Sequence, residues 1–190
     1  MHSESRPVRV ESESTGVVMV NPAKKSSFVP PSDMTRVLHT AMTRADPALA
    51  WKIFVDSLRW NEFTDLYGRL TWIEGKPWAV GSRLRMELLR PARIIINRLI
   101  TLSRPGEQIA WIDHSRRSTV EQWVTFAVES DGRTAVHILS QVVGAQPKVA
   151  GQSFTEFLKA NVSRWFDAFC VECDRVHADT QSKSTISGNS

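Results

Sequence analysis

Few residues in this chain could carry acid–base chemistry, and they are not grouped. His39, His114 and His137 are the imidazoles within the regularly patterned part of the sequence, where they could act as general acids or bases. Asp113 and His114 are neighbours on a predicted strand, so their side chains point to opposite faces and cannot form a direct dyad. The sequence shows no serine–histidine–aspartate or cysteine–histidine motif, no metal-ligand cluster and no phosphate-binding glycine loop. His39 and Asp113 remain as catalytic candidates, and no metal or cofactor is expected.

Two cysteines, Cys170 and Cys173, form a C-x-x-C pair, a spacing that redox-active dithiols use. Those dithiols lie at the N-terminal end of a helix, where the helix dipole stabilises a thiolate. The present pair falls near the C-terminal end of a predicted helix, which disfavours the thiolate. A metal site would need more ligands than His177 adds. We therefore expect two reduced cysteines that serve as ordinary helix residues.

A long amphipathic helix is predicted near the C-terminus, from about Gly151 to Val176. Its large apolar residues recur at spacings of three and four, the period of one buried helix face, and the opposite face is polar. A helix of about 25 residues, or about 37 Å at 1.5 Å per residue, needs a large partner surface. The preceding residues are patterned as strands, so we expect the helix to pack on a sheet and to enclose a cavity with it.

Strand and turn signals fill the sequence before this helix. A strand is predicted at 35–43, and Asp46-Pro47 then begins a short helix, with the aspartate as N-cap and the proline at the first helical position. A second short helix is expected at 61–67, and Asp131-Gly132 is typical of a hairpin turn. This order indicates an α+β fold with an antiparallel sheet. Further strands are expected at 68–74, 82–89, 93–102, 108–114, 119–129 and 134–143, with a loop at 75–81 that exposes Trp78.

Length and composition bound the organisation of the chain. Its 190 residues, 42% of them hydrophobic, fit one domain with a substantial core. We expect a disordered N-terminal arm at 1–33, a ligand-binding domain at 34–178 and a disordered C-terminal tail at 179–190. No apolar run approaches the ~20 residues of a membrane span, and the N-terminus lacks the apolar segment of a secretion signal. The expected compartment is therefore the cytoplasm.

Four local signatures follow one another along the chain: Asp46-Pro47 with Trp51, Asp56 and Trp60; Trp72 with Gly75, Trp78 and Gly81; Pro105 with Ile109-Ala110-Trp111; and Phe126 with Asp131-Gly132, Thr134 and Gly144. Their order resembles the START-like (SRPBCC) superfamily and, within it, the polyketide cyclase/dehydrase-type ligand-binding proteins, over about residues 35–176. The resemblance implies a helix-grip fold, in which a curved seven-stranded antiparallel sheet wraps around the C-terminal helix and leaves a cavity. The scaffold hosts binders, transporters, cyclases and chaperone cofactors, so it specifies fold more than activity. The apolar 138–141 segment departs from relatives that often carry charge on the last strand.

Strand alternation predicts which side chains face such a cavity. Gln122, Ser140 and Asp113 are the polar ones and could orient a carbonyl or hydroxyl of a ligand, although a one-residue slip in register would turn them to solvent. An apolar wall with few polar groups suits a small hydrophobic ligand, but the same side chains could simply fill the core. The predicted ligand-binding residues are Trp72, Trp78, Leu84, Met86, Leu88, Trp111, Asp113, Gln122, Val124, Phe126, Ile138, Ser140, Phe154, Leu158 and Trp165.

Three functions are compatible with this sequence. The first is binding of a small hydrophobic molecule, aromatic, polyketide or lipid-like, in the cavity. The second is a cyclase/aromatase-type enzyme that uses the same cavity, with one polar residue transferring protons. The third is a protein-interaction module, for which Arg83, Arg85, Arg90, Arg93 and Arg98 could form a basic outer face on a chain of net charge +4. No nucleic-acid motif accompanies these arginines, so a nucleic-acid partner is not expected, and the oligomeric state is left open.

Overall fold

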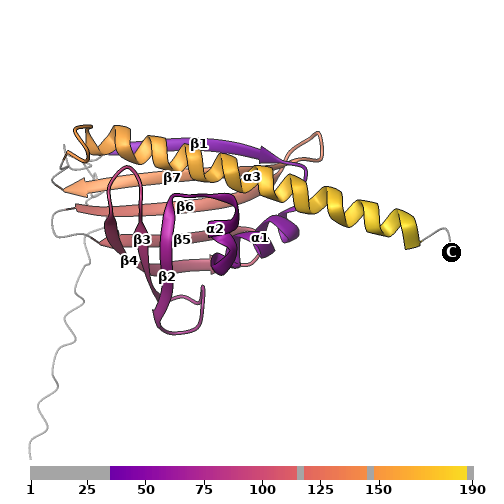
Figure 1. Ribbon diagram of the computed structural model, residues 1–190, viewed down its shortest axis with the longest axis horizontal. Coiled ribbons are helices and arrows are strands. Elements are labelled where there is room, and N and C mark those ends of the chain that lie inside the picture. The colour runs from indigo at the N-terminus through magenta and orange to yellow at the C-terminus, as the bar shows by residue number, and fades with distance from the viewer. Residues whose placement is uncertain (1–34, 115–117, 145–147, 188–190) are drawn as a thin grey trace, which may run out of the picture. The chain divides into compact units, whose positions relative to one another are not determined.

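The structure, a computed structural model, describes residues 35–114, 118–144 and 148–187. The predicted N-terminal arm, 1–33, and the last three positions of the predicted tail, 188–190, lie outside the described residues. Seven strands form one antiparallel sheet in the order β1-β7-β6-β5-β4-β3-β2. The sheet curves around one side of a long C-terminal helix, as Figure 1 shows. The predicted helix-grip architecture is therefore confirmed.

The strands begin and end close to their predicted bounds. Those at 35–43 and 108–114 match the prediction residue for residue. The others differ by one or two residues at an end. The strands are β1 (Thr35–Thr43), β2 (Tyr67–Glu74), β3 (Arg83–Leu88), β4 (Ile94–Arg104), β5 (Gln108–His114), β6 (Ser118–Val128) and β7 (Thr134–Gly144).

Helix α1 (Pro47–Val55) begins as predicted. Asp46 is extended, with φ −66° and ψ 163°, and its carboxylate accepts a hydrogen bond from the backbone N–H of Leu49 at 2.8 Å. Pro47 occupies the first turn, where its missing N–H leaves no partner unsatisfied. The buried side of α1 includes Phe54, which lies at the centre of the aromatic core.

The second short helix lies earlier than predicted. A 3₁₀ turn, η1 (Ser57–Arg59), leads directly into α2 (Trp60–Phe63), and β2 follows at Tyr67. The Trp60 indole is buried and its Nε1 donates to the Phe54 carbonyl oxygen at 3.0 Å, which fixes the turn at this point. Tyr67 pairs with Leu88 across the sheet instead of extending a helix. The prediction of a second short helix is therefore confirmed, but its predicted bounds, 61–67, were wrong because strand pairing takes the end of that segment.

Helix α3 (Phe154–Ser187) is longer than predicted and runs about 51 Å at 1.5 Å per residue. Ser153 caps its N-terminus in a capping box, with Glu156 N–H donating to Ser153 Oγ at 3.3 Å and Ser153 N–H donating to Glu156 Oε2 at 3.1 Å. Its C-terminal turns extend beyond the strands (Figure 1). The predicted tail at 179–190 is therefore helical as far as Ser187. No glycine or proline interrupts the chain between Gly151 and Gly188, so no local stop signal ends the helix earlier.

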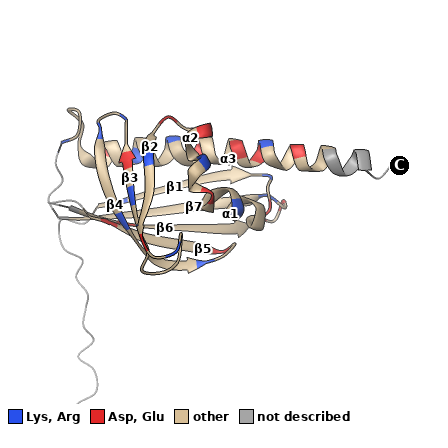
Figure 2. Ribbon diagram, turned by 60° about the horizontal axis from the view of Figure 1, so that its bottom comes forward, with Lys and Arg blue, Asp and Glu red and all other residues tan. Residues whose placement is uncertain are grey.

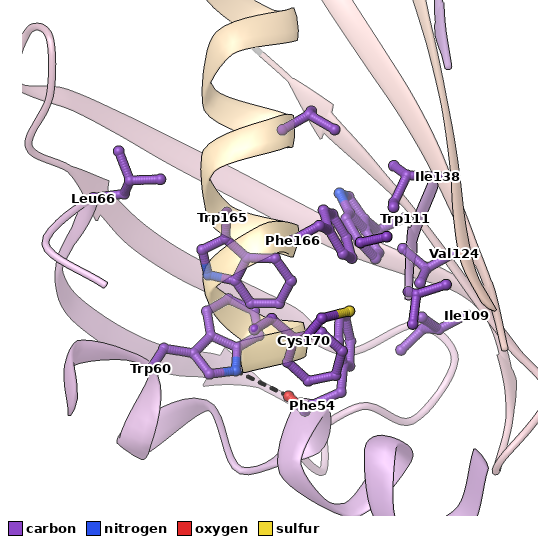
Figure 3. Close-up of a cluster of buried hydrophobic side chains, with 14 of the residues drawn as sticks. Phe54, Trp60, Leu66, Ile109, Trp111, Val124, Ile138, Trp165, Phe166 and Cys170 are labelled. Carbon is purple, nitrogen blue, oxygen red and sulfur yellow. Dashed lines mark hydrogen bonds between the residues drawn. The ribbon is translucent and has the colours of Figure 1, made fainter. Parts of the chain in front are cut away.

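The core between α1, α3 and the sheet is unusually aromatic. Phe54 packs against Trp165 at 5.6 Å and Phe169 at 5.8 Å between ring centroids, and Trp60 packs against Trp165 at 4.7 Å. Figure 3 shows Phe54, Trp60 and Trp165 converging from α1, α2 and α3, together with the Trp60–Phe54 hydrogen bond. Such ring pairs add to the free energy of burial through edge-to-face and offset contacts.

Trp78 belongs to this core, contrary to the prediction of an exposed loop tryptophan. Its side chain is 5% exposed, its ring lies 5.2 Å from that of Phe54, and its Nε1 donates to the Val55 carbonyl oxygen at 2.6 Å. The residue adopts φ +61°, a conformation that costs a non-glycine residue energy. Burial of the indole compensates for that cost. The prediction of an exposed tryptophan was wrong because it relied on the local loop signal and not on the distant core contacts.

Cys170 and Cys173 are free and buried, as expected. Burial raises the pKa of the Cys170 thiol to about 12 and shifts the pKa of Cys173 in the same direction. Both side chains are therefore neutral thiols that pack in the core at neutral pH. In the described part of the chain, no group of three or more His, Cys, Asp and Glu side chains is placed to hold a metal ion. None of the described helices combines the length and apolar character needed to cross a membrane.

Candidate functional site

A cavity of about 210 Å³ lies between the concave face of the sheet and α3. Its walls come from α1, α2, five of the strands and the first half of α3, and most of its surface is apolar. It therefore has the character of a site for a small hydrophobic molecule. The lining residues are Phe54, Trp60, Tyr67, Leu88, Ile94, Ile95, Ile96, Arg98, Trp111, Asp113, His114, Val120, Gln122, Val149, Phe154, Phe157, Leu158, Asn161, Val162, Trp165 and Phe166.

An ion pair between Arg98 and Asp113 is the main polar feature of the cavity wall. The two residues are direct cross-strand partners on β4 and β5. Arg98 Nε donates to Asp113 Oδ1 at 2.8 Å and Nη2 donates to Oδ2 at 2.9 Å, a bidentate geometry. Their side chains are only 5% and 12% exposed. The Arg98 guanidinium carbon also lies 4.1 Å from the centroid of the Trp111 ring, so an aromatic face supports the cation.

The sequence analysis placed Arg98 on a basic outer face, and the structure corrects this. On β4 the even-numbered positions face inward, and Arg98 follows Ile96 and precedes Ile100 on that side. Because residues two apart on a strand share a face, the apolar Ile96 and Ile100 on either side of Arg98 indicate that all three face inward. The alternation of inward and outward positions along this strand was therefore the signal that could have predicted the inward orientation of Arg98. Arg98 was instead assigned to the outer face because charged residues usually lie at the protein surface.

The remaining arginines of the predicted basic face lie outside the cavity, and most are paired. Arg83 Nε lies 2.9 Å from Glu74, Arg90 Nε lies 3.3 Å from Asp65, and Arg93 forms an ion pair with Glu87. Figure 2 shows positive and negative positions interleaved on this side of the molecule. Three of the four outer arginines therefore have an acidic partner, and the outer face is not uniformly basic.

A chain of hydrogen bonds continues across the floor of the sheet. Trp111 Nε1 donates to Gln122 Oε1 at 3.0 Å, and Gln122 Nε2 donates to Ser140 Oγ at 2.8 Å. Each pair consists of cross-strand partners, so the register of β5, β6 and β7 positions all three side chains. Both amide atoms of Gln122 are thus used within the protein. The chain orients the Trp111 ring, and Ser140 lies fully buried beneath the cavity surface.

Tyr67 contributes a hydroxyl group that the sequence analysis did not anticipate. Its position at the start of β2 places it on the cavity wall, near enough to Arg98 and Asp113 to experience their charges. Burial raises the pKa of Tyr67 to about 12, so the hydroxyl is protonated at neutral pH and can both donate and accept a hydrogen bond. The residue was missed because 61–67 was assigned to a helix.

Seven of the predicted ligand-binding residues line the cavity, and eight do not. Those in the lining are Leu88, Trp111, Asp113, Gln122, Phe154, Leu158 and Trp165. The others lie on the concave side of the sheet or at its edge. Aromatic and aliphatic side chains pack over them, so they belong to the hydrophobic core or contact it. These are Trp72, Trp78, Leu84, Met86, Val124, Phe126, Ile138 and Ser140.

His39, the other catalytic candidate, lies away from the cavity. Its Nε2 is 2.9 Å from Asp167 Oδ1, and its Nδ1 is 3.3 Å from Ser163 Oγ. Ser163 and Asp167 lie one turn apart on α3, and His39 lies on β1, so these bonds fasten the edge strand to the helix. The sequence analysis saw no serine–histidine–aspartate motif, because the three residues meet only in the folded chain. They are not part of the cavity lining, which points to a structural role.

Comparison with known proteins identifies the fold of this chain but not its activity. No family model matches the chain, and no curated protein matches it. Among solved structures, that of Ara h 8.0201 aligns with a TM-score of 0.60 at 11% identity, covering 74% of this chain and 97% of that one. The ZhuI aromatase/cyclase from Streptomyces sp. R1128 aligns with a TM-score of 0.59 at 19% identity, covering 75% of this chain and 94% of that one. Both likenesses show the same fold, a helix-grip arrangement of an antiparallel sheet and a long C-terminal helix.

Proposed function

We propose that the chain binds a small hydrophobic molecule in the cavity between the sheet and α3. The observation that carries this proposal is an apolar cavity of about 210 Å³ whose wall also contains the Arg98–Asp113 pair. A ligand that buried about 200 Å² of apolar surface there would gain about 5 kcal/mol, before the cost of association, at about 25 cal/mol per Å². The ion pair and the Tyr67 hydroxyl supply the few polar groups that would orient it.

The first test is native mass spectrometry of the protein purified from its own cells, compared with its denatured mass. An additional small mass that disappears on denaturation would support an occupied cavity and identify the chemical class. Naphthalene, a neutral fluorescent hydrocarbon, serves as a probe of the same cavity in the protein without its natural ligand. Absence of both a co-purifying mass and probe binding would contradict the proposal.

Two substitutions on α3 localise the probe. Val162 is buried in the cavity lining, and Val171 is 70% exposed on the same helix. We expect Val162→Phe to fill the cavity and to weaken probe binding by about tenfold or more, because overpacking removes the space that the probe needs. Val171→Phe adds the same ring at the surface and should bind the probe as the wild type does. Equal binding by all three proteins, with unchanged circular dichroism, would exclude the cavity as the site.

A cyclase/aromatase-type enzyme is the second candidate. The supporting observation is that Asp113, Arg98 and the Tyr67 hydroxyl lie together in the cavity, in a fold shared with a solved aromatase/cyclase. Asp113 keeps its place as a catalytic candidate, whereas His39 is outside the cavity. The test is formation of aromatic product from a short poly-β-carbonyl thioester by the wild type and by Asp113→Asn. Product formation that Asp113→Asn lowers would support an enzyme, and equal rates in the two proteins would contradict this role of Asp113.

A further inference from the structure

The size of the cavity limits what it can hold. Aromatic side chains close one end of the space between sheet and helix. Phe54 is stacked 6.2 Å from Trp111 and packs edge-to-face 5.6 Å from Trp165, between ring centroids. The remaining volume is about 210 Å³. An apolar cavity of about 150 Å³ holds benzene in other proteins, and sites for drug-sized molecules begin at about 300 Å³. The space therefore encloses one or two fused rings, and most of a long acyl or polyketide chain would lie outside it.

The walls favour flat rings over flexible chains. Trp111, Trp165 and Phe166 all line the cavity, and Trp165 and Phe166 pack edge-to-face at 4.5 Å. A hydrogen bond to Gln122 orients Trp111, and the Arg98 guanidinium covers one of its faces. Because these rings are held by packing and hydrogen bonds, the shape of the cavity is set before a ligand enters, which lowers the cost of binding a rigid molecule.

The Arg98–Asp113 pair limits the charge of the ligand. Nε and Nη2 of Arg98 donate to Asp113, so Nη1 remains as a donor group, and the carboxylate oxygens keep lone pairs beyond those two bonds. The pair as a whole is neutral. A carboxylate ligand would bring a negative charge beside Asp113 in an apolar cavity, and an amine would bring a positive charge beside Arg98, both unfavourable. A neutral group that accepts from Arg98 and donates to Asp113 satisfies both partners.

A hydroxyl group has this combination of donor and acceptor. The Tyr67 hydroxyl also lines the cavity and experiences the charges of Arg98 and Asp113. It has no hydrogen-bond partner among the described residues, so it is a second group that could bind the ligand hydroxyl. A ketone would accept from Arg98 but would leave Asp113 without a donor.

We infer that the cavity selects a neutral hydroxylated aromatic molecule of one or two rings, bound through the Arg98–Asp113 pair. This inference rests on the proposed binding function and specifies its ligand class. The Arg98 Nη1 group donates to the ligand oxygen, and the ligand hydroxyl donates to the Asp113 carboxylate. The aromatic part lies against Trp111, Trp165 and Phe166.

The test compares three probes of nearly equal size at pH 7 by calorimetry: 2-naphthol, naphthalene and 2-naphthoate. We expect 2-naphthol to bind about tenfold or more tightly than either of the others, as a hydrogen bond to a charged group predicts. Equal binding of naphthalene and 2-naphthol, or tightest binding of 2-naphthoate, would overturn the inference and leave the binding function standing. Tighter binding of palmitate than of 2-naphthol would overturn the size argument. Failure of all four molecules to bind would instead contradict the proposed function itself.

A double variant tests the role of the pair. Arg98→Met with Asp113→Leu removes both charges together and leaves an apolar wall. We expect it to bind naphthalene within about threefold of the wild type and to lose the preference for 2-naphthol, since the hydrogen bonds that produce that preference are gone. Arg85→Met, on the exposed side of the neighbouring strand β3, is the matched control and should keep the preference. A double variant that still prefers 2-naphthol by tenfold would overturn the assignment to this pair.

Discussion

Replacing Arg98 alone with methionine should destabilise the protein more than replacing it together with Asp113. The single change leaves the Asp113 carboxylate without its cation in a site where the two side chains are 5% and 12% exposed. Removal of one partner from a buried pair costs about 3–5 kcal/mol, and because water still reaches part of Asp113 we expect the lower end, about 3 kcal/mol. For a chain of this size that corresponds to a fall in Tm of roughly 6–12 °C.

The assay is thermal and urea unfolding, followed by circular dichroism, of the wild type, both single variants and the double variant Arg98→Met with Asp113→Leu. The double variant should lie within about 1 kcal/mol of the wild type, because apolar side chains of similar volume replace a buried ion pair at little cost. The interaction free energy from the cycle should then exceed about 2 kcal/mol. Arg83→Met, which breaks an exposed pair with Glu74, is the control and should cost less than about 1 kcal/mol.

Additive effects would refute this reasoning. If the double variant lost as much stability as the two single variants together, Arg98 and Asp113 would not act as a pair in the folded protein. A single Arg98→Met variant as stable as Arg83→Met would show that solvent screens the pair, contrary to the burial found here.

Three further predictions concern the scaffold. Asp46→Ala removes the N-cap of α1 and should lower the free energy of unfolding by about 1 kcal/mol, whereas Asp46→Asn should keep most of it in urea denaturation. Cys170 and Cys173 should react with Ellman's reagent at pH 8 only after denaturant is added, because burial raises both pKa values; rapid reaction of the native protein would contradict their burial. The pKa of Glu172 is lowered, chiefly by its hydrogen bond from Arg175, so its contribution to stability is present above the unfolded-state pKa and is lost as the pH falls through the lower folded-state value. Glu172→Gln should therefore reduce the loss of stability between pH 5 and pH 3, and an unchanged pH profile of the unfolding free energy would contradict this.

Several features of this protein could be predicted from the sequence because they depend on neighbours along the chain. The strands at 35–43 and 108–114 were predicted with their observed bounds, and the Asp46-Pro47 pair marked the start of α1. The apolar period of the last helix and the strands before it indicated an α+β fold with an antiparallel sheet, and the resemblance to the START-like superfamily implied the helix-grip architecture. The hydrogen bonds and side-chain periods that produce these elements lie within a few residues, so the sequence displays them directly.

Errors arose where a distant contact outweighed a local signal. Trp78 lies in a glycine-flanked loop, yet its indole enters the core and bonds to the Val55 carbonyl. Tyr67 ends a segment with helical character, yet strand pairing with Leu88 places its hydroxyl on the cavity wall. Arg98 has the polarity of an exposed residue, but its place on β4 turns it inward to Asp113.

The sequence by itself determined the elements, their order and the concave face on which the cavity lies. Only the tertiary structure decided where on that face the space remains open. Phe54 and Trp60 reach across from α1 and α2 and fill one end, so Val124 and Ile138 are core while Trp111 and Asp113 line the cavity, although all four share one side of the sheet. The physical reason is that secondary structure follows from local periodicity, whereas a cavity is the volume left after side chains from distant segments have packed.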